Sequence, residues 1–283
     1  MMNIRPRLAA LAVLLLAPGV RAEPAAPKSP ALTVSSFAKV AADTDALLAG
    51  KTPSPATQGL FKSYDNTAHA YTRNPECIAA RVDLSCVSVA NSANADGTGG
   101  NRGCVTMITP LHGVTNSHFG QPYAPGVVHY FVDRANAVYP RKIVSSATVN
   151  ATDIQVVTFD TPLPASVPPA QLLAATAVRL LPPGTPLLST NQQKHVVITE
   201  LGGFSGGELV VLPAAAPSRR AWTTSPPAVI GDSDSPTFVL LDGRPRLLCT
   251  FHTNMSGPTL SDNFTAIRSL LGGKYALDAA ALR

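Results

Sequence analysis

Short apolar runs separated by turn-forming residues cover most of the chain, and this pattern predicts a protein built mainly of β-strands. The expected strands are residues 84–90, 104–109, 127–132, 142–144 and 154–159 in the first half, and residues 177–181, 186–189, 195–201, 208–212, 237–241 and 246–251 in the second. Many short strands at such intervals are typical of a β-barrel or a β-sandwich.

Helical spacing of apolar residues occurs only near the two ends. Residues 35–48 predict an amphipathic helix that ends at a glycine, and we expect it to pack on the domain in preference to acting as a pro-segment. Residues 261–271 predict a second helix, capped by Ser261 or Asp262 and stopped by Gly272.

Three further segments divide the chain. Residues 52–75 have no clear period and are expected to be irregular. Residues 161–170 contain four prolines and are the expected boundary between two halves. The glycine-rich residues 202–207 lack the Lys-Ser/Thr pair and the helix that follow a phosphate-binding loop, so they predict a hairpin turn.

The first 22 residues have the pattern of a secretory signal peptide. Arg5 and Arg7 precede the apolar residues 8–17, and small residues surround the expected cleavage point at Ala22. We therefore expect an exported protein, secreted or periplasmic. No later apolar run is long enough to predict a membrane span.

Composition narrows the function further. The chain has 283 residues, 45% of them hydrophobic and 14% charged, which suits a packed core. Three of the 22 basic residues and none of the 17 acidic residues lie in residues 1–22, so the remainder carries 19 against 17, a net charge of +2. Without a basic cluster, a nucleic-acid partner is not expected.

The four cysteines allow two interpretations. Cys77 and Cys86 are close enough in sequence to staple a hairpin if the protein is exported. Cys104 and Cys249 lie in apolar runs and are expected to be small buried residues. No Cys/His spacing matches a zinc site, and we expect neither a metal nor a cofactor.

The strongest candidate for chemistry is the turn Gly231-Asp232-Ser233-Asp234-Ser235-Pro236, which comes directly before an apolar strand. Gly231 lets the backbone approach a substrate, and such a turn can point successive N–H groups at one atom. Ser233 would then be a nucleophile. The same residue types also form solvated turns or weak calcium loops, so the serine needs a base and a carboxylate elsewhere.

His118 is the preferred base among the six histidines, because it follows an expected strand and a short turn. His112, His129 and His195 are interpreted as ordinary core or surface residues. Asp153 is the preferred carboxylate, since it begins the apolar run 154–159 and would be partly buried. A buried carboxylate bonded to one ring nitrogen leaves the other nitrogen free as a base.

Two other aspartates compete with Asp153 for this role. Asp160 precedes Thr-Pro and is expected to be a turn residue. Asp133 precedes Arg134 and is expected to be exposed.

These segments together resemble the trypsin-like serine peptidases. The run Thr109-Pro110-Leu111-His112-Gly113-Val114-Thr115-Asn116-Ser117-His118 resembles their histidine segment, Thr152-Asp153-Ile154 their aspartate segment, and residues 231–236 their nucleophile loop. Residues 263–268 are similar to the end of the family, and the likeness covers about residues 84–271. The order His, Asp, Ser and the gaps between the three also fit.

The resemblance implies an all-β fold of two six-stranded antiparallel β-barrels, with an N-terminal and a C-terminal helix. The implied organisation is a signal peptide at 1–22, an N-terminal extension with one helix at 23–75, a first barrel at 76–165, and a second barrel with the C-terminal helix at 166–283. It implies a monomeric serine endopeptidase that acts on protein or peptide substrates.

The resemblance also implies residue roles. Ser233 attacks the carbonyl carbon, His118 moves the proton, and Asp153 orients the imidazole, while the N–H groups of Gly231 and Ser233 form the oxyanion hole. Pro227, Thr250 and His252 would line the substrate pocket. Pro227 replaces the acidic residue of trypsins, so a preference for Lys or Arg is not expected.

Several positions depart from the family. Asp234 stands where a glycine usually follows the nucleophile, Asn116-Ser117 replaces a common pair of alanines, and Phe119 replaces a cysteine whose usual partner matches Cys104. No activation sequence is present to pair with Asp232. An alternative is therefore an inactive protein of the same fold that acts as a binding or scaffold module. An α/β-hydrolase is disfavoured because no Gly-x-Ser-x-Gly surrounds Ser233.

Overall fold

The computed structural model describes residues 34–89, 103–149, 151–223, 231–253, 255–273, 277 and 279–280. The expected signal peptide at residues 1–22 and the expected pocket residue Pro227 lie outside these ranges. Among the described residues, no helix combines the length and the apolar character needed to cross a bilayer.

Strands dominate the described chain, as the apolar pattern predicts. The helices are α1 (Val34–Leu48), α2 (Pro55–Gln58), α3 (Ala175–Val178), α4 (Pro217–Arg220) and α5 (Phe264–Leu270), with a 3₁₀ turn at Gln121–Tyr123. The strands are β1 (Phe61–Asp65), β2 (Ala70–Arg73), β3 (Thr106–Met107), β4 (His112–Asn116), β5 (Val128–Val132), β6 (Val138–Thr148), β7 (Ile154–Phe159), β8 (Gln171–Leu173), β9 (Pro186–Thr190), β10 (Val196–Ser205), β11 (Glu208–Pro213), β12 (Pro236–Leu241), β13 (Arg244–Thr250), β14 (Ser256–Pro258) and β15 (Ala279–Ala280).

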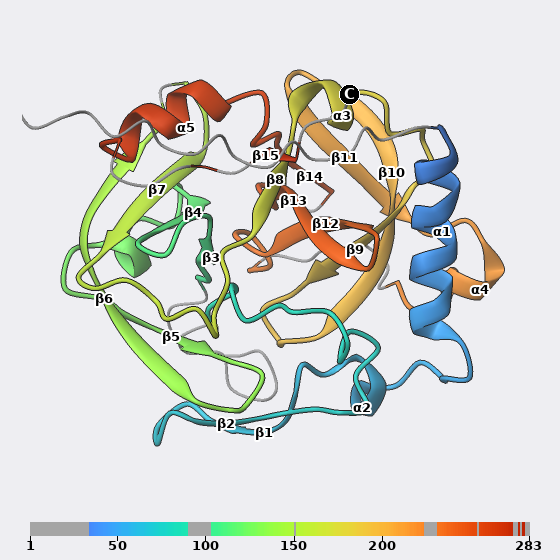
Figure 1. The fold of residues 1–283 in the computed structure, drawn as a ribbon, viewed down its shortest axis with the longest axis horizontal. Helices are drawn as coiled ribbons and strands as arrows, with labels where there is room; N and C mark the ends of the chain where they lie inside the picture. The colour runs from blue at the N-terminus through green and yellow to red at the C-terminus, as the bar shows by residue number, and fades with distance from the viewer. Residues whose placement is uncertain are drawn as a thin grey trace, which may run out of the picture.

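The strands form two main sheets and one hairpin (Figure 1). The smaller sheet has the order β3-β4-β7-β6-β5, and the larger one has the order β14-β11-β10-β9-β12-β13-β8-β15. Pairing in the described residues is antiparallel except where β8 joins β13 and β15. The β1-β2 hairpin lies apart at the lower edge of the view (Figure 1).

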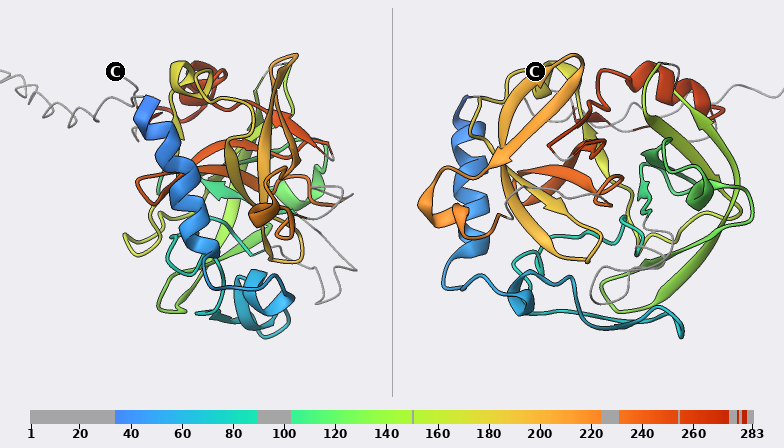
Figure 2. Two further views of the ribbon diagram at one scale, coloured as in Figure 1. Left: turned by 90° about the vertical axis from the view of Figure 1, so that its right-hand side faces the viewer. Right: turned by 180° about the vertical axis from the view of Figure 1, so that it is seen from behind.

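The sheets curl in the manner of a half-barrel but do not close. Two complete six-stranded barrels are therefore not confirmed, although the mostly β fold is. The proline-rich residues 161–170 lie between the last strand of the smaller sheet and β8, the first strand of the larger sheet in the chain. Figure 2 shows both sheets from the side and from behind, with α1 on the outside of the larger sheet.

Both expected terminal helices are confirmed. α1 packs against β12 and β9 through its buried Val40, because its apolar stripe faces the larger sheet. α5 is shorter than expected, and its N-cap is Asn263 rather than Ser261 or Asp262. Gly272 follows its end with a φ of 65°, a backbone conformation that glycine adopts at low cost.

Most expected strands are confirmed within a few residues, and the glycine-rich hairpin turn joins β10 to β11 as expected. Residues 177–181 are not a strand, since α3 occupies the start of this segment. The alanines of this segment favour a helix. The prolines at 182 and 183 have no backbone N–H, so they cannot donate the hydrogen bonds of a strand after it. Residues 84–89, the described part of the expected strand 84–90, form only single bridges, Val87 with Thr106 and Val89 with Tyr130.

Two further expectations are wrong. Residues 52–75 are not irregular, because they contain α2 and the β1-β2 hairpin. The Cys77–Cys86 staple does not form, since all four cysteines are free and buried. Burial raises the pKa of the Cys86 and Cys249 thiols to about 12, so both are inert apolar fillers like Cys104.

One buried cluster includes side chains of both main sheets. Val114 and Phe159 from the smaller sheet belong to the same cluster as Phe238 and Leu247 from the larger sheet. The single tryptophan, Trp222, is buried in it as well. A shared core of this kind couples the two sheets energetically.

We expect Leu247→Ala to lower the free energy of unfolding by about 2–5 kcal/mol, because Leu247 is fully buried and leaves a cavity. Urea unfolding followed by Trp222 fluorescence and by far-UV circular dichroism measures the change. Leu212→Ala is the control: this leucine is 42% exposed on β11 and should matter little. Separate transitions for the two signals would contradict the shared core.

Candidate functional site

Strand register brings His118 and Asp153 together. β4 and β7 run antiparallel with Asn116 opposite Ile154. His118 comes two residues after β4 ends and Asp153 comes just before β7 begins, so both lie at the same end of the smaller sheet. The backbone N–H of Ser117 continues the ladder by donating to the carbonyl of Asp153 at 2.8 Å.

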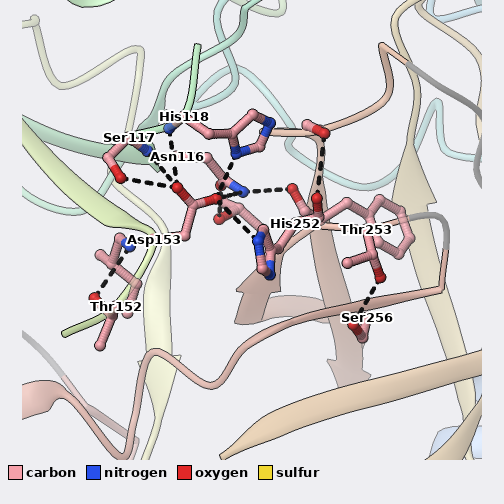
Figure 3. Close-up of polar contacts among 12 residues, drawn as sticks. Asn116, Ser117, His118, Thr152, Asp153, His252, Thr253 and Ser256 are labelled. Atoms are coloured by element: carbon pink, nitrogen blue, oxygen red, sulfur yellow. Dashed lines mark hydrogen bonds and ion pairs between the residues drawn. The ribbon is translucent and has the colours of Figure 1, made fainter. Parts of the chain in front are cut away.

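The carboxylate of Asp153 is held by several donors (Figure 3). Its Oδ2 lies 2.6 Å from Nδ1 of His118 and accepts from Nδ2 of Asn116 at 3.0 Å. Its Oδ1 accepts the Ser117 hydroxyl at 2.8 Å and the backbone N–H groups of Ser117 and His118 at 3.1 and 2.9 Å. Asp153 is therefore fixed as the acceptor that orients the His118 ring.

Burial opposes ionisation of Asp153, but hydrogen bonds from His118 and Ser117 outweigh it and leave the pKa of this carboxyl below its usual value. Asp153 is thus a carboxylate at neutral pH. The anion favours the His118 tautomer with hydrogen on Nδ1, which leaves Nε2 able to accept a proton.

Ser233 reaches the same region on the turn that precedes β12. Its hydroxyl lies 3.5 Å from the backbone carbonyl of His252, and the rings of His252 and His118 are 5.8 Å apart. The structure therefore places Ser233 beside the backbone of His252, whose ring lies near the paired His118 and Asp153. No hydrogen bond joins Ser233 to His118 in the described part of the chain, so the serine hydroxyl points at a carbonyl instead.

In the described part of the chain, two backbone N–H groups of this turn have no acceptor. Asp234 donates its N–H to the carbonyl of Phe251 at 2.9 Å, and Ser235 donates to Asp232 at 3.0 Å. Within the residues that the structure describes, no protein acceptor takes the N–H of Gly231 or of Ser233. Gly231 has a φ of 99°, which only glycine adopts easily. These two groups are the ones that an oxyanion hole would require.

Asp234 does not present a charge to the site. Its backbone is left-handed, with a φ of 78°, and its fully buried side chain turns into the smaller sheet. Oδ1 accepts the backbone N–H of Asn116 at 2.9 Å, and Oδ2 accepts the hydroxyl of Tyr123. Asp234, one of the departures from the trypsin-like pattern, thus joins the Ser233 turn to β4, the strand before His118.

Burial raises the pKa of Asp234 to about 8, and the hydrogen bonds from Tyr123 and Asn116 only partly oppose this. The carboxyl is therefore largely protonated at neutral pH. A neutral group beside Ser233 does not repel a developing oxyanion.

His252 occupies the other side of Asp153. Its Nε2 lies 3.9 Å from Oδ2 of Asp153, and its Nδ1 lies 2.8 Å from Oε1 of Glu208 on β11. Thr250 is fully buried and donates its hydroxyl to Oδ1 of Asn116 at 2.5 Å. Of the three expected pocket residues, His252 lies at the site next to Asp153. Thr250 is buried and contacts the site only through Asn116. Pro227 lies outside the described residues.

The competing residues have other partners. Asp133 is buried, not exposed as expected, and it closes its own loop by accepting from the N–H groups of Ala135 and Ala137. Asp160 is an exposed turn residue, as expected. His112 and His129 are buried core residues, and the pKa of His129 is lowered to about 4 by burial.

Asp232 does find a partner without an activation peptide. It is buried, and its Oδ1 accepts the backbone N–H of Gln192 at 3.1 Å.

Sequence reasoning missed several residues of the site. Asn116 and Ser117 bind Asp153, Tyr123 binds Asp234, and Glu208 binds His252. The polar pair before His118 was a usable signal, because polar residues at the end of a buried strand need partners. Tyr123 and Glu208 carry no local signal, since their partners are more than 40 residues away in the sequence.

A pocket of about 590 Å³ opens beside the site and is lined by Asp153, Glu208 and His252, among others. In the described residues, His118, Asp153 and His252 are also the one group of His, Cys, Asp or Glu whose donor atoms are close enough to share a metal ion. The arrangement can therefore transfer a proton through His118 or ligate a cation.

Comparison with known proteins does not assign the chain to a family. No protein-family model and no curated protein matches the chain. The functional argument therefore rests on the geometry of the site.

We expect the stability of the protein relative to Asp234→Asn to fall as the pH rises from about 4 to about 8. The folded protein keeps a proton on Asp234 up to pH 8, whereas the unfolded chain releases it near pH 4, so rising pH favours unfolding. The loss should be at most about 1.4 kcal/mol per pH unit.

Urea titrations of both proteins at a series of pH values measure this difference. Asp160→Asn removes an exposed carboxyl and is the matched control. A constant difference between the protein and Asp234→Asn across this range would show that the buried carboxyl is ionised in the fold.

Proposed function

We propose that the protein is an exported serine endopeptidase that cleaves protein or peptide substrates through an acyl-enzyme. The observation that carries the proposal is the 2.6 Å contact between Nδ1 of His118 and Oδ2 of Asp153, with Ser233 on the adjoining turn. A histidine oriented by a buried carboxylate beside a serine is the arrangement that activates a hydroxyl.

In the proposed mechanism, the Ser233 hydroxyl leaves the His252 carbonyl and donates to Nε2 of His118. The serine oxygen attacks the substrate carbonyl, and the proton passes to His118. Asp153 stabilises the imidazolium through Nδ1. The N–H groups of Gly231 and Ser233 receive the negative charge on the carbonyl oxygen. His118 then returns the proton to the leaving amine, and water repeats the sequence to release the acid.

Isolated bridges between strands support the two β-barrels that the resemblance implies. Residues 87 and 89 bridge to β3 and β5, the two edge strands of the smaller sheet. In the larger sheet, Cys249 of β13 bridges to Thr259, which directly follows the edge strand β14. Each curled sheet thus has a contact across its open side. In this proposal, the site lies where the barrels meet.

A second function has one specific observation in its favour. The Ser233 hydroxyl contacts a backbone carbonyl and not the imidazole, as expected of an inactive protein that uses the fold as a binding module. Two observations favour the peptidase over the binding module. The side chain of Asp234 is fixed by hydrogen bonds. In the described residues, the N–H groups of Gly231 and Ser233 have no acceptor, and a binding module would not require such free donors.

A biotinylated fluorophosphonate separates the two functions. We expect it to label the protein at Ser233, and we expect Ser233→Ala and His118→Ala to lose labelling because nucleophile and base act as a unit. Cleavage of an unstructured protein substrate should fall by about 10⁴-fold or more in both variants.

Ser235→Ala is the matched control, since it removes a hydroxyl from the same turn without touching the proposed nucleophile, and it should still be labelled. Far-UV circular dichroism confirms that each variant is folded. Folded protein that is never labelled would reject the peptidase and favour the binding module.

A further inference from the structure

The second histidine gives the site a feature that peptide hydrolysis does not need. Oδ2 of Asp153 lies between two imidazoles, 2.6 Å from Nδ1 of His118 and 3.9 Å from Nε2 of His252. One donor atom from each of the three residues falls within 4.8 Å of the others. We propose that His118, Asp153 and His252 bind a zinc ion that switches the serine site off.

The donor set suits zinc. Imidazole nitrogen and carboxylate oxygen are its ordinary ligands besides thiolate, and two histidines with one carboxylate leave a fourth position for water. Calcium and magnesium prefer sites made of oxygen alone, so two nitrogen donors select against them.

The surrounding residues hold the ligands as a metal site requires. Nδ1 of His252 bonds to Glu208, whose other oxygen accepts the hydroxyl of Ser256, and this directs Nε2 of His252 towards Asp153. A ligand histidine commonly donates its second nitrogen to a carboxylate in this way. Asn116 and Ser117 fix Asp153 independently of His118.

Charge and access favour a divalent cation as well. Asp153 and Glu208 form ion pairs only with histidines in the described chain, and neither contacts a lysine or an arginine. The pocket of about 590 Å³ beside them provides a path for entry. Figure 3 shows Asp153 between the two histidine rings.

Zinc binding needs a modest rearrangement, in which the donor nitrogens of the two histidines, now within 4.8 Å of each other, approach by at most about 1.5 Å. Zinc ligands at about 2.0–2.2 Å from the metal are about 3.3 Å apart in a tetrahedron. The Asp153–His118 contact must lengthen, and the Asp153–His252 contact must shorten, each by less than about 1 Å. Both histidine side chains are 37% exposed and can move, whereas Asp153 is 11% exposed and stays fixed.

Zinc bound here would block the proposed chemistry through either nitrogen of His118. Coordination through Nδ1 breaks its bond to Asp153, and coordination through Nε2 removes the lone pair that accepts the serine proton. This inhibitory effect rests on the proposed peptidase function. Metal binding itself does not, so the two can be tested separately.

Binding is tested by isothermal titration of zinc chloride into the full chain carrying Ser233→Ala, which lacks the nucleophile but keeps the three ligands. We expect one zinc per chain. Adding His252→Ala or His252→Gln should weaken binding at least 10-fold, and Glu208→Gln should weaken it by about 10–100-fold. His69→Asn, on the β1-β2 hairpin, is the histidine control and should bind normally.

Inhibition is tested by fluorophosphonate labelling of the unmodified protein. We expect zinc to stop labelling and a chelator to restore it, whereas magnesium and calcium have no effect. Failure of Ser233→Ala to bind zinc, or binding that His252→Ala and His252→Gln leave unchanged, would overturn the metal site even if labelling succeeds. Zinc binding in a protein that is never labelled would keep the metal site and reject the peptidase.

Discussion

The buried carboxyl of Asp234 joins the two halves of the site. It extends from the Ser233 turn into the smaller sheet and accepts hydrogen bonds from the Asn116 N–H and the Tyr123 hydroxyl. Asn116 in turn bonds to Thr250, the last residue of β13 in the larger sheet, and to Phe251 directly after it. These contacts fix the distance between the turn and His118. Without them, the shared apolar core would hold the sheets together but would not set the geometry of a proton transfer.

Asp153 is the second centre of the arrangement. It accepts from Asn116 and Ser117 and lies between His118 and His252, while Glu208 binds the far side of His252. Carboxylate and imidazole thus alternate along a row at the edge of a pocket. The same carboxylate orients a base and is a ready ligand for a cation. Proposed catalysis and proposed inhibition therefore depend on competition for one oxygen atom.

The departures from the trypsin-like pattern become intelligible through their contacts. Asn116 and Ser117 place polar groups where methyl groups are usual, and both bind Asp153. Asp234 stands in place of glycine, adopts a positive φ, and buries its side chain. An exposed, ionised aspartate next to the nucleophile would repel an oxyanion, but the burial and protonation of Asp234 remove that effect.

The sequence by itself determined the β-rich fold, both terminal helices and the hairpin turn at 202–207, and it singled out His118 and Asp153 as candidates. These depend on local periodicity and on turn chemistry, and the two candidates stood out because each lies next to an apolar run. Only the tertiary structure decided that the sheets stay open, that β4 is a strand despite its polar residues, and that His252 turns to Asp153. The reason is that a polar side chain chooses its partner from distant segments, and strand register, which no local pattern encodes, decides which segments meet.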